Sequence, residues 1–386
     1  MNKKQLAEVL GLSEKILEEF DLCDHCLGRI FAKRLRLRSG QRLGKKIHST
    51  LKIKNTKCYI CKNIFEALPL YTQKMLDASE CYRFRTFLVG SKLRPSVLDR
   101  DDNVRSKFRL RGMDSIKAAV TKRLVTQFAK KTKKSLRSNE PDVTFTIDFK
   151  TESCQVQSKP LYLLGKYTKQ ERGIPQKQRP CENCSGKGCV TCSQHGMTEF
   201  DSVEGMISKF LFERFGASQT RITWIGGEDS SSLVLGSGRP FFVKLLNPKK
   251  RNVRLPKKIR AGRIDIHNMG PAGRPPANPV QFESKVVLLI SSEMPIPKNA
   301  PSRLCALEEG KIAIYENSGK RAVKSVRNIS CRVQSENTLL LSMTAEGGLP
   351  MKHLVSGENV FPNVSDLLEV PCRCETFDFK EIKILN

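Results

Sequence analysis

The chain has 386 residues, of which 39% are apolar, which is enough for two or three domains with hydrophobic cores and argues against wholesale disorder. Lys and Arg number 68 against 39 acidic residues, and this net charge of +29 opposes compaction unless the partner is a polyanion, either nucleic acid or an anionic membrane. No apolar run approaches the roughly 20 residues needed to span a bilayer, so nucleic acid is the favoured partner and no membrane role is expected.

Cysteine usage points to a reducing, cytoplasmic location. Eight of the fourteen Cys fall into four Cys-x-x-Cys pairs, the spacing at which two thiolates reach one metal ion. A secreted disulfide scaffold would be shorter and denser in Cys, so we expect metal sites rather than disulfides. The candidate ligands, in chain order, are Cys23, Cys26, Cys58, Cys61, Cys181, Cys184, Cys189 and Cys192.

Residues 1–79 are predicted to form a basic, zinc-binding region. Apolar residues at helical spacing over 3–20 predict an amphipathic helix. The stretch 29–57 carries eleven Lys or Arg and no acid, and it separates the first two Cys pairs. We expect these two pairs to share one zinc ion, with the basic stretch forming an arm between them.

Residues 80–166 are predicted to form a small α/β domain that contacts RNA. Apolar residues recur at helical intervals over 116–128, and residues 143–147 alternate with the period of a strand. The predicted helix ends in the basic run 130–134, which gives the domain one strongly basic edge.

Residues 167–201 are predicted to be a linker that carries the second cysteine cluster. Its four Cys lie close together, and Gly186 and Gly188 relieve the turn between the two knuckles. Four-thiolate zinc is favoured, and an iron–sulfur cluster is the main alternative. Both cysteine groups offer four thiolates and no place for water, so we expect structural metal, in one or two ions, rather than catalytic metal.

Residues 202–386 are rich in strand signals and are predicted to form a longer domain, to which the family resemblance described below assigns catalysis. Two Pro/Gly-rich tracts, 262–279 and 293–301, are predicted to be exposed loops. Strands are predicted around 222–225, 241–243, 285–290 and 339–343.

The segment 226–242 is the most unusual part of this region. Glycines flank a turn of acids and hydroxyls between two apolar strands, which can present one carboxylate at the end of a sheet, although a plain hairpin is an alternative. The following stretch 244–263 has nine basic residues and no acid, and is predicted to track RNA phosphates. Predicted RNA contacts are Lys166, Tyr167, Arg172, Lys249, Lys250, Arg251, Arg254, Lys257 and Lys258.

The order of several motifs resembles one enzyme family. Gly-x-Glu-Asp at 226–229, followed by Gly-Ser-Gly and Arg-Pro-Phe up to residue 241, is similar to the active-site region of archaeal-type tRNA pseudouridine synthases. That family acts on positions 54 and 55 of the tRNA T loop. The similarity extends to four further blocks, at 165–176, 247–251, 345–352 and 362–368.

This resemblance implies an α+β protein, with a THUMP-like RNA-binding region before a pseudouridine synthase fold that has a mixed, mainly antiparallel sheet. It also implies an isomerase that uses Asp229 as the catalytic aspartate and needs no organic cofactor. Lys352 is expected to hold the carboxylate in place, with Arg239 as an alternative partner. The implied partner is the T arm of tRNA, with no obligate protein partner and a monomeric state.

Two departures from the family keep other interpretations open. Gly227 stands where many members have Arg, and Ser284 stands where the family has a base-stacking Tyr, with Phe282 as a possible substitute. A non-catalytic tRNA-binding protein with a degenerate synthase domain is therefore one alternative. An ATP-dependent tRNA thiolation enzyme is another, because Gly-Gly-x-Asp-Ser resembles a pyrophosphate loop. That loop precedes a helix, however, whereas the residues after Ser232 predict a strand or turn.

Overall fold

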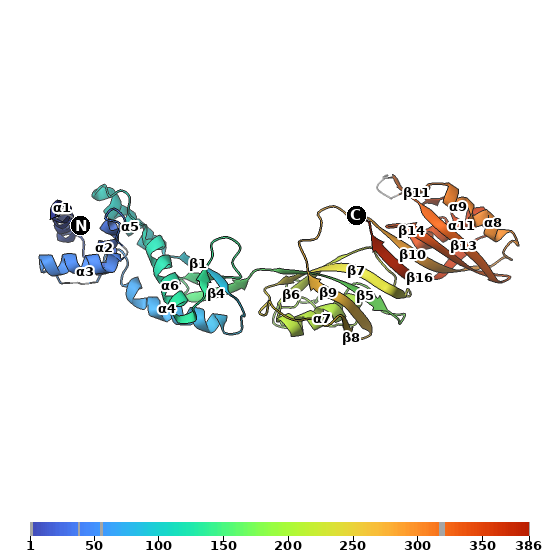
Figure 1. Cartoon of the computed structure of the whole chain (residues 1–386), viewed down its shortest axis with the longest axis horizontal. Coiled ribbons are helices and arrows are strands. Elements are labelled where there is room, and N and C mark those ends of the chain that lie inside the picture. Colours follow the sequence, from blue (N-terminus) through green and yellow to red (C-terminus); the bar gives the residue numbers. More distant parts are fainter. Residues whose placement is uncertain (1–2, 38, 55–56, 316–320, 386) are drawn as a thin grey trace. The chain divides into compact units, whose positions relative to one another are not determined.

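The computed structural model describes residues 3–37, 39–54, 57–315 and 321–385. The chain divides into two units, Met1–Lys159 and Pro160–Asn386, which run from blue to green and from green to red in Figure 1. We refer to them as unit 1 and unit 2. Each has its own hydrophobic core, because the buried apolar residues form two separate clusters. None of the described helices is long and apolar enough to cross a membrane.

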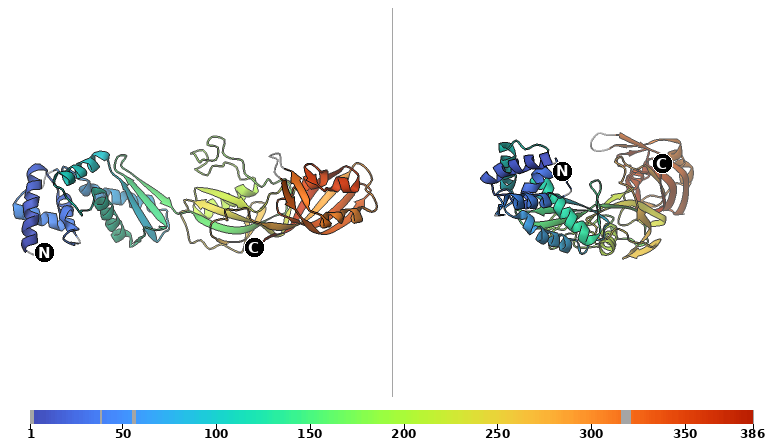
Figure 2. Two further views of the ribbon diagram at one scale, coloured as in Figure 1. Left: turned by 90° about the horizontal axis from the view of Figure 1, so that it is seen from above. Right: turned by 60° about the vertical axis from the view of Figure 1, so that its left-hand side comes forward.

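Unit 1 consists of a small mixed sheet with helices packed against it, and of a group of N-terminal helices, α1 to α3, that pack against one another (Figure 1). Its strands lie in the order β2-β1-β3-β4, with β1 parallel to β2 and β3, and β3 antiparallel to β4. Helices α4 and α6 pack against this sheet (Figure 2). The elements are α1 (Lys3–Glu19), α2 (Asp24–Ala32), α3 (Gly40–Leu51), α4 (Ile64–Ser79), β1 (Thr86–Lys92), α5 (Pro95–Lys107), α6 (Ile116–Thr132), β2 (Ser135–Leu136), β3 (Val143–Asp148) and β4 (Ser153–Ser158).

Helix α6 shows how the sequence pattern produces the core of unit 1. Its N-terminus is capped by Ser115, whose Oγ accepts a hydrogen bond from the Ala118 N–H at 3.2 Å. The apolar residues at helical spacing are buried, and Phe128 packs against Phe87 and Phe145, each at 4.9 Å between ring centroids. The predicted helix and the predicted strand at 143–147 are both confirmed.

A buried ion pair joins the cysteine-containing region to the rest of unit 1. The Arg29 guanidinium on α2 contacts the Asp101 carboxylate on α5, and both side chains are at least 95% buried. Asp101 also accepts a hydrogen bond from the Ile116 N–H at 3.0 Å, and Arg29 donates to the Asp114 carbonyl at 2.8 Å. The two regions predicted as separate domains, 1–79 and 80–166, therefore share one core. The predicted basic arm at 29–57 contains helix α3.

Unit 2 is built on a mixed, mainly antiparallel sheet, as predicted. Its strands lie in the order β13-β14-β10-β16-β7-β5-β9-β8, with β6 also paired to β7; of these pairings, only that of β7 with β16 is parallel. A smaller sheet has the order β12-β11-β15. The elements are β5 (Leu161–Lys169), α7 (Val203–Phe215), β6 (Gln219–Trp224), β7 (Val234–Leu246), β8 (Lys258–Ala261), β9 (Ile264–Pro271), β10 (Phe282–Ser292), α8 (Ala300–Leu304), α9 (Ala306–Glu309), β11 (Ile312–Tyr315), β12 (Arg321–Lys324), β13 (Val326–Ser335), β14 (Thr338–Glu346), α10 (Met351–Ser356), β15 (Val360–Phe361), α11 (Val364–Leu368) and β16 (Cys372–Ile384).

Two boundaries differ from those predicted for this region. Strand β5 lies between β7 and β9 in the large sheet, so the second unit starts at Pro160 rather than after residue 166. The predicted loop 262–279 contains strand β9, because Ile264 and Ile266 alternate into the core despite the surrounding Pro and Gly. The predicted strands at 222–225, 241–243, 285–290 and 339–343 fall on β6, β7, β10 and β14, with β6 ending one residue early.

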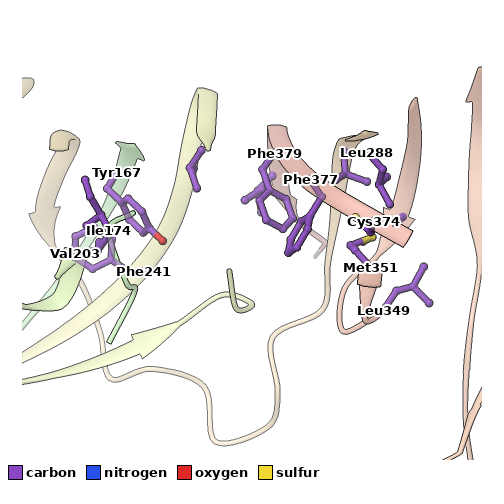
Figure 3. Packing of buried hydrophobic residues seen from close by; sticks show 14 of the residues in the cluster. Tyr167, Ile174, Val203, Phe241, Leu288, Leu349, Met351, Cys374, Phe377 and Phe379 are labelled. Carbon is purple, nitrogen blue, oxygen red and sulfur yellow. The ribbon is translucent and has the colours of Figure 1, made fainter. Parts of the chain in front are cut away.

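Aromatic residues fill the core of unit 2 on both sides of the β7–β16 pairing. Tyr167 on β5 packs against Phe241 on β7 with 6.0 Å between ring centroids (Figure 3). Phe377 and Phe379 on β16 lie 5.7 Å apart, with Met351 of α10 nearby in Figure 3. Phe377 and Phe379 line a cavity together with the turn between β6 and β7, which carries the residues considered next.

Candidate active site and cysteine clusters

Asp229 lies in the turn between β6 and β7, with about 30% of its side chain exposed. Its Oδ1 accepts a hydrogen bond from the Ser231 N–H at 2.9 Å, and its Oδ2 lies 2.6 Å from the Nζ of Lys352 on α10. The Lys352 ammonium, together with the Ser231 N–H, holds the pKa of Asp229 well below its usual range. The structure therefore brings the predicted pair together and keeps this carboxylate ionised at neutral pH.

The residue before Asp229, Glu228, has a buried side chain, whereas that of Asp229 is partly exposed. The Glu228 side chain is fully buried, with Oε1 at 3.1 Å from Lys169 Nζ and Oε2 at 3.4 Å from Arg239 Nε. The Arg239 guanidinium is also fully buried and lies 4.3 Å from the ring centroid of Phe379. Arg239 was predicted as an alternative partner of Asp229, but in the structure it is paired with Glu228. The partner of Asp229 is Lys352.

A cavity of about 440 Å³ opens beside Asp229. Phe282 forms part of its wall, and the ring has room because Gly226 and Gly347 carry no side chain; a Cβ on Gly347 would lie 2.4 Å from Phe282 Cε1. The volume is within the usual range for a small-molecule site. The lining residues are Gly226, Gly227, Glu228, Asp229, Arg239, Phe282, Ser284, Glu346, Gly347, Gly348, Leu349, Pro350, Met351, Phe377 and Phe379.

Two of the predicted RNA contacts, Tyr167 and Arg172, make hydrogen bonds within the protein. Tyr167 is fully buried, burial raises the pKa of its phenol, and its hydroxyl accepts a hydrogen bond from Gln176 Nε2 at 3.2 Å. Arg172 makes two hydrogen bonds to the Asp378 carboxylate, at 2.7 and 2.8 Å, and donates to the Ser231 carbonyl. The prediction for Tyr167 is therefore wrong for this conformation, and Arg172 anchors the turn that follows Asp229.

The other predicted RNA contacts lie at the surface of unit 2. Lys166 and Arg251 are half-buried, whereas the remaining basic residues of the 249–258 stretch are exposed. One of them, Lys258, is 3.2 Å from the Asp265 carboxylate. Pro248 is buried, and the N–H groups of the next two residues bond to the Phe215 carbonyl, so the start of this stretch is fixed to α7. The arrangement leaves a basic, solvent-facing segment.

Among the described residues, the cysteines form two groups that could hold metal ions, and within each group the four sulfurs lie within 4.8 Å of one another. Cys23 and Cys61 sulfurs are 3.7 Å apart, and those of Cys184 and Cys192 are 3.8 Å apart. A tetrahedral zinc site with Zn–S distances of about 2.3 Å has S–S edges of about 3.8 Å. Both groups therefore fit a four-thiolate metal ion, and they are two distinct sites in two different units.

Models of known protein families match both units of the chain. A model described as the archaeal Pus10 THUMP domain matches residues 71–148, and one described as the Pus10 C-terminal domain matches residues 162–270. The protein named tRNA pseudouridine synthase Pus10 from Nitrosopumilus maritimus is 45% identical over 98% of both chains. The chain belongs to the Pus10 family of tRNA pseudouridine synthases. Its first unit therefore contains a THUMP domain, and its second contains the Pus10 C-terminal domain.

Other relatives show the same correspondence along nearly the whole chain. The Pus10 protein of Cenarchaeum symbiosum is 36% identical over 94% of this chain and 90% of its own. Among solved structures, a Cbf5-Nop10-Gar1 complex covers 56% of this chain and 48% of the matched chain at 11% identity and a TM-score of 0.30, which is too low to support an argument.

Sequence reasoning missed the buried partners of the Pus10-type turn. Glu228 and Lys169 both lie inside motifs that carried the family resemblance, but neither was assigned a role. The signal was the presence of acidic and basic residues next to apolar strands, at positions where burial requires a counter-ion. Asp378, which holds Arg172, is more than 200 residues away from it in the sequence and has no local signature.

Proposed function

We propose that the chain isomerises uridine to pseudouridine at position 54, position 55 or both in the T loop of tRNA. The observation that carries this proposal is the position of Asp229, an ionised carboxylate at the wall of a cavity, in a chain whose Pus10 relatives are tRNA pseudouridine synthases. The reaction detaches a base from its ribose and rejoins it through carbon, which needs a carboxylate that attacks or deprotonates at the sugar.

The cavity supplies the other requirements of this reaction. The target uridine leaves its stack and enters the cavity, where Phe282 offers an aromatic face beside the buried Ser284 hydroxyl. Lys352 keeps Asp229 ionised and limits its rotation. The exposed basic stretch 249–258 offsets the cost of unstacking through contacts with phosphates. No organic cofactor is part of this scheme.

The two cysteine groups are proposed to bind one structural zinc ion each. Four thiolates complete the coordination of zinc and leave no position for substrate, so the metal contributes to folding and not to the chemical step. The second group also receives N–H···S bonds at 3.2 Å from Gly188 and Gly196, the pattern expected for charged sulfurs. The protein is proposed to act as a cytoplasmic monomer on the T arm of tRNA.

The first experiment is pseudouridine mapping of an unmodified tRNA transcript after incubation with the purified protein, without ATP or any other cofactor. We expect conversion at 54, 55 or both, and loss of at least ~10³-fold in rate for Asp229→Asn because the attacking carboxylate is gone. The tRNA affinity of the variant should stay within about twofold, since Asp229 makes no contribution to phosphate binding. Loss of binding by a folded variant would contradict the role given to Asp229.

The main alternative is a tRNA-binding protein that has lost catalysis, which Ser284 in place of the usual Tyr favours. Tight, salt-sensitive tRNA binding with no conversion of any uridine would establish it. A thiolation enzyme receives no support from the structure, because strand β7 begins at Val234 shortly after the glycine-rich turn, where that class needs a helix N-terminus.

A further inference from the structure

Buried side chains donate hydrogen bonds to the backbone of the turn that carries Asp229, in addition to the Gly173 N–H, which donates to the Ser230 carbonyl at 2.8 Å. The Ile225 carbonyl accepts a hydrogen bond from Arg239 Nη1 at 2.8 Å, and the Gly226 carbonyl accepts one from Gln176 Nε2 at 3.3 Å. The Asp229 carbonyl itself accepts one from Lys169 Nζ at 3.1 Å. A backbone segment without ladder partners needs such donors, because each buried carbonyl left unpaired destabilises the conformation.

Two of these three donors are buried cations that depend on Glu228. The side chains of Lys169, Glu228 and Arg239 are all fully buried, so neither cation reaches water. Burial favours the neutral form of Lys169 and lowers its pKa, whereas the Glu228 carboxylate favours the charged form that donates three hydrogens. Glu228 thus favours the charged form of Lys169 and pairs with both buried donors.

We propose that Glu228 and Lys169 are positioning residues for Asp229, acting as a buried ionic clamp that fixes the backbone of the turn so that the reacting carboxylate stays against the sugar. This inference rests on the proposed function, because it takes Asp229 to be the reacting group. The clamp acts through the main chain, and it is separate from the exposed Lys352, which acts on the carboxylate directly.

The clamp predicts how the reaction changes when it is removed. Without Lys169, the Ile174 carbonyl loses its donor and the Asp229 carbonyl keeps only the Ser232 N–H, at 3.1 Å. The turn then relaxes away from Lys352 and from the cavity. The charged and titratable groups around Asp229 are Lys352 from α10, Lys169 from β5 and the Cys374 thiol from β16, whose pKa burial raises to about 11. Glu228, Arg239 and Glu346 line the same cavity. Cys374 is therefore neutral, and the pKa of Asp229 rises toward its ordinary value when the lysines recede.

The test uses the full-length protein and single-turnover conversion of a tRNA transcript by saturating enzyme, from pH 4 to pH 8. We expect Lys169→Met to lower the rate roughly 10- to 100-fold, the effect of a misplacement of about 1 Å, while tRNA affinity stays unchanged. The acid limb of the pH profile should move to higher pH. Glu228→Gln should move the limb in the same direction, and Lys169→Arg should restore part of the rate.

A control separates positioning from loss of fold. Asp101→Asn removes the counter-ion of a buried arginine in unit 1, so it should lower thermal stability without moving the acid limb. The clamp is wrong if Lys169→Met lowers the rate only in proportion to the folded fraction, with the limb unmoved. If the wild-type protein converts no uridine, the proposed function fails instead. In that case, crystal structures of the wild type and Lys169→Met test the clamp by itself. If the turn that carries Asp229 has the same position in both structures, the clamp is wrong.

Discussion

The two units place their cysteine groups in opposite settings. In unit 1, all four Cys are buried and belong to the hydrophobic core, beside residues such as Leu27 and Phe65. In unit 2, Cys184 and Cys189 are only half-buried, and Val190 within the second knuckle is 89% exposed. None of the Cys of this second group belongs to the core cluster of its unit, which is built from the large sheet.

This contrast shows which parts of the chain can lose a functional group without losing their fold. In unit 1, the cysteine ligands belong to the hydrophobic core, and a buried ion pair lies in the same unit. A change at this metal site is therefore also a change in the core. Unit 2 has an extensive sheet core of its own, and its cysteine group and the Asp229–Lys352 pair lie at the periphery of that core. We therefore expect changes in unit 1 to act on stability and changes at the exposed sites of unit 2 to act on activity.

Loss of a metal ligand in unit 1 should have the largest effect. Cys26→Ser removes one thiolate from the fully buried group, and a structural zinc site contributes on the order of 10 kcal/mol to folding. We expect unit 1 to lose cooperative unfolding and to exchange its amide hydrogens rapidly, while the amides of the unit 2 sheet stay protected. Hydrogen exchange measured by mass spectrometry distinguishes the two units in one experiment.

The matched control is Cys189→Ser, at a half-buried cysteine of the second group. The same chemical change should there release one metal ion per chain while leaving the unit 2 sheet intact, because no core residue loses a contact. Metal analysis and a thermal melt provide the comparison. The proposed difference between the two cysteine groups would be wrong if Cys189→Ser removed hydrogen-exchange protection from the unit 2 sheet as fully as Cys26→Ser removes it from unit 1.

Elements defined by local patterns could be predicted from the sequence. Helix α6 and strand β3 follow directly from apolar periods of 3.6 and 2, because those periods are set by backbone geometry alone. The cysteine pairs were equally local, since two thiolates at that spacing reach one ion regardless of the fold. The pairing of Asp229 with Lys352, 123 residues further along the chain, came only from a family resemblance and not from any pattern in the residues.

Long-range pairings could not be predicted. Strand β5 was assigned to a domain edge and a linker, because its partners β7 and β9 lie about 70 to 110 residues later and no local signal names them. The same limit explains Tyr167, a polar-tipped aromatic in a basic motif whose burial depends on that pairing. Arg239 was given the wrong partner because Glu228 and Asp229 are adjacent, and the backbone turn alone decides which carboxylate faces inward.

A change at the exposed site of unit 2 should affect activity and leave stability nearly unaltered. Lys352→Met removes a charged hydrogen bond to Asp229, and we expect roughly a tenfold lower rate at neutral pH, because about half of the lysine side chain is exposed and solvent screens the pair. Lys352 lowers the pKa of Asp229 in the wild type. The stabilisation of the carboxylate is therefore present at neutral pH and lost as pH falls, and its removal should move the acid limb of the rate to higher pH.

The control for this variant is Lys285→Met, which removes another exposed lysine, 2.9 Å from the Glu381 carboxylate and outside the cavity lining. Its pH profile should match that of the wild type. If Lys352→Met instead lowered the melting temperature as much as a ligand change in unit 1, the separation of site and core in unit 2 would not hold.

The smallest effect is expected where the site has unused space. Gly227 has an ordinary backbone conformation, and a Cβ there would come no closer than 4.0 Å to Gln176, so a side chain fits. Gly227→Arg, the residue common in the family, should leave stability unchanged and raise tRNA affinity a fewfold, with about one more phosphate contact in the salt dependence.

The neighbouring glycine should behave differently. Gly226 has a φ of +78°, and a Cβ there would lie 2.5 Å from Phe282 and 2.7 Å from Arg239, so Gly226→Ala must displace the cavity wall or the buried cation. Gly226→Ala should therefore lower the melting temperature, whereas Gly227→Arg should leave it unchanged and raise tRNA affinity. A thermal melt and a binding titration measure the two effects. Equal melting temperatures and tRNA affinities of the two variants would mean that the groups packed beneath the turn do not fix it. They would also contradict the distinction between an exposed site and a tightly packed core in unit 2.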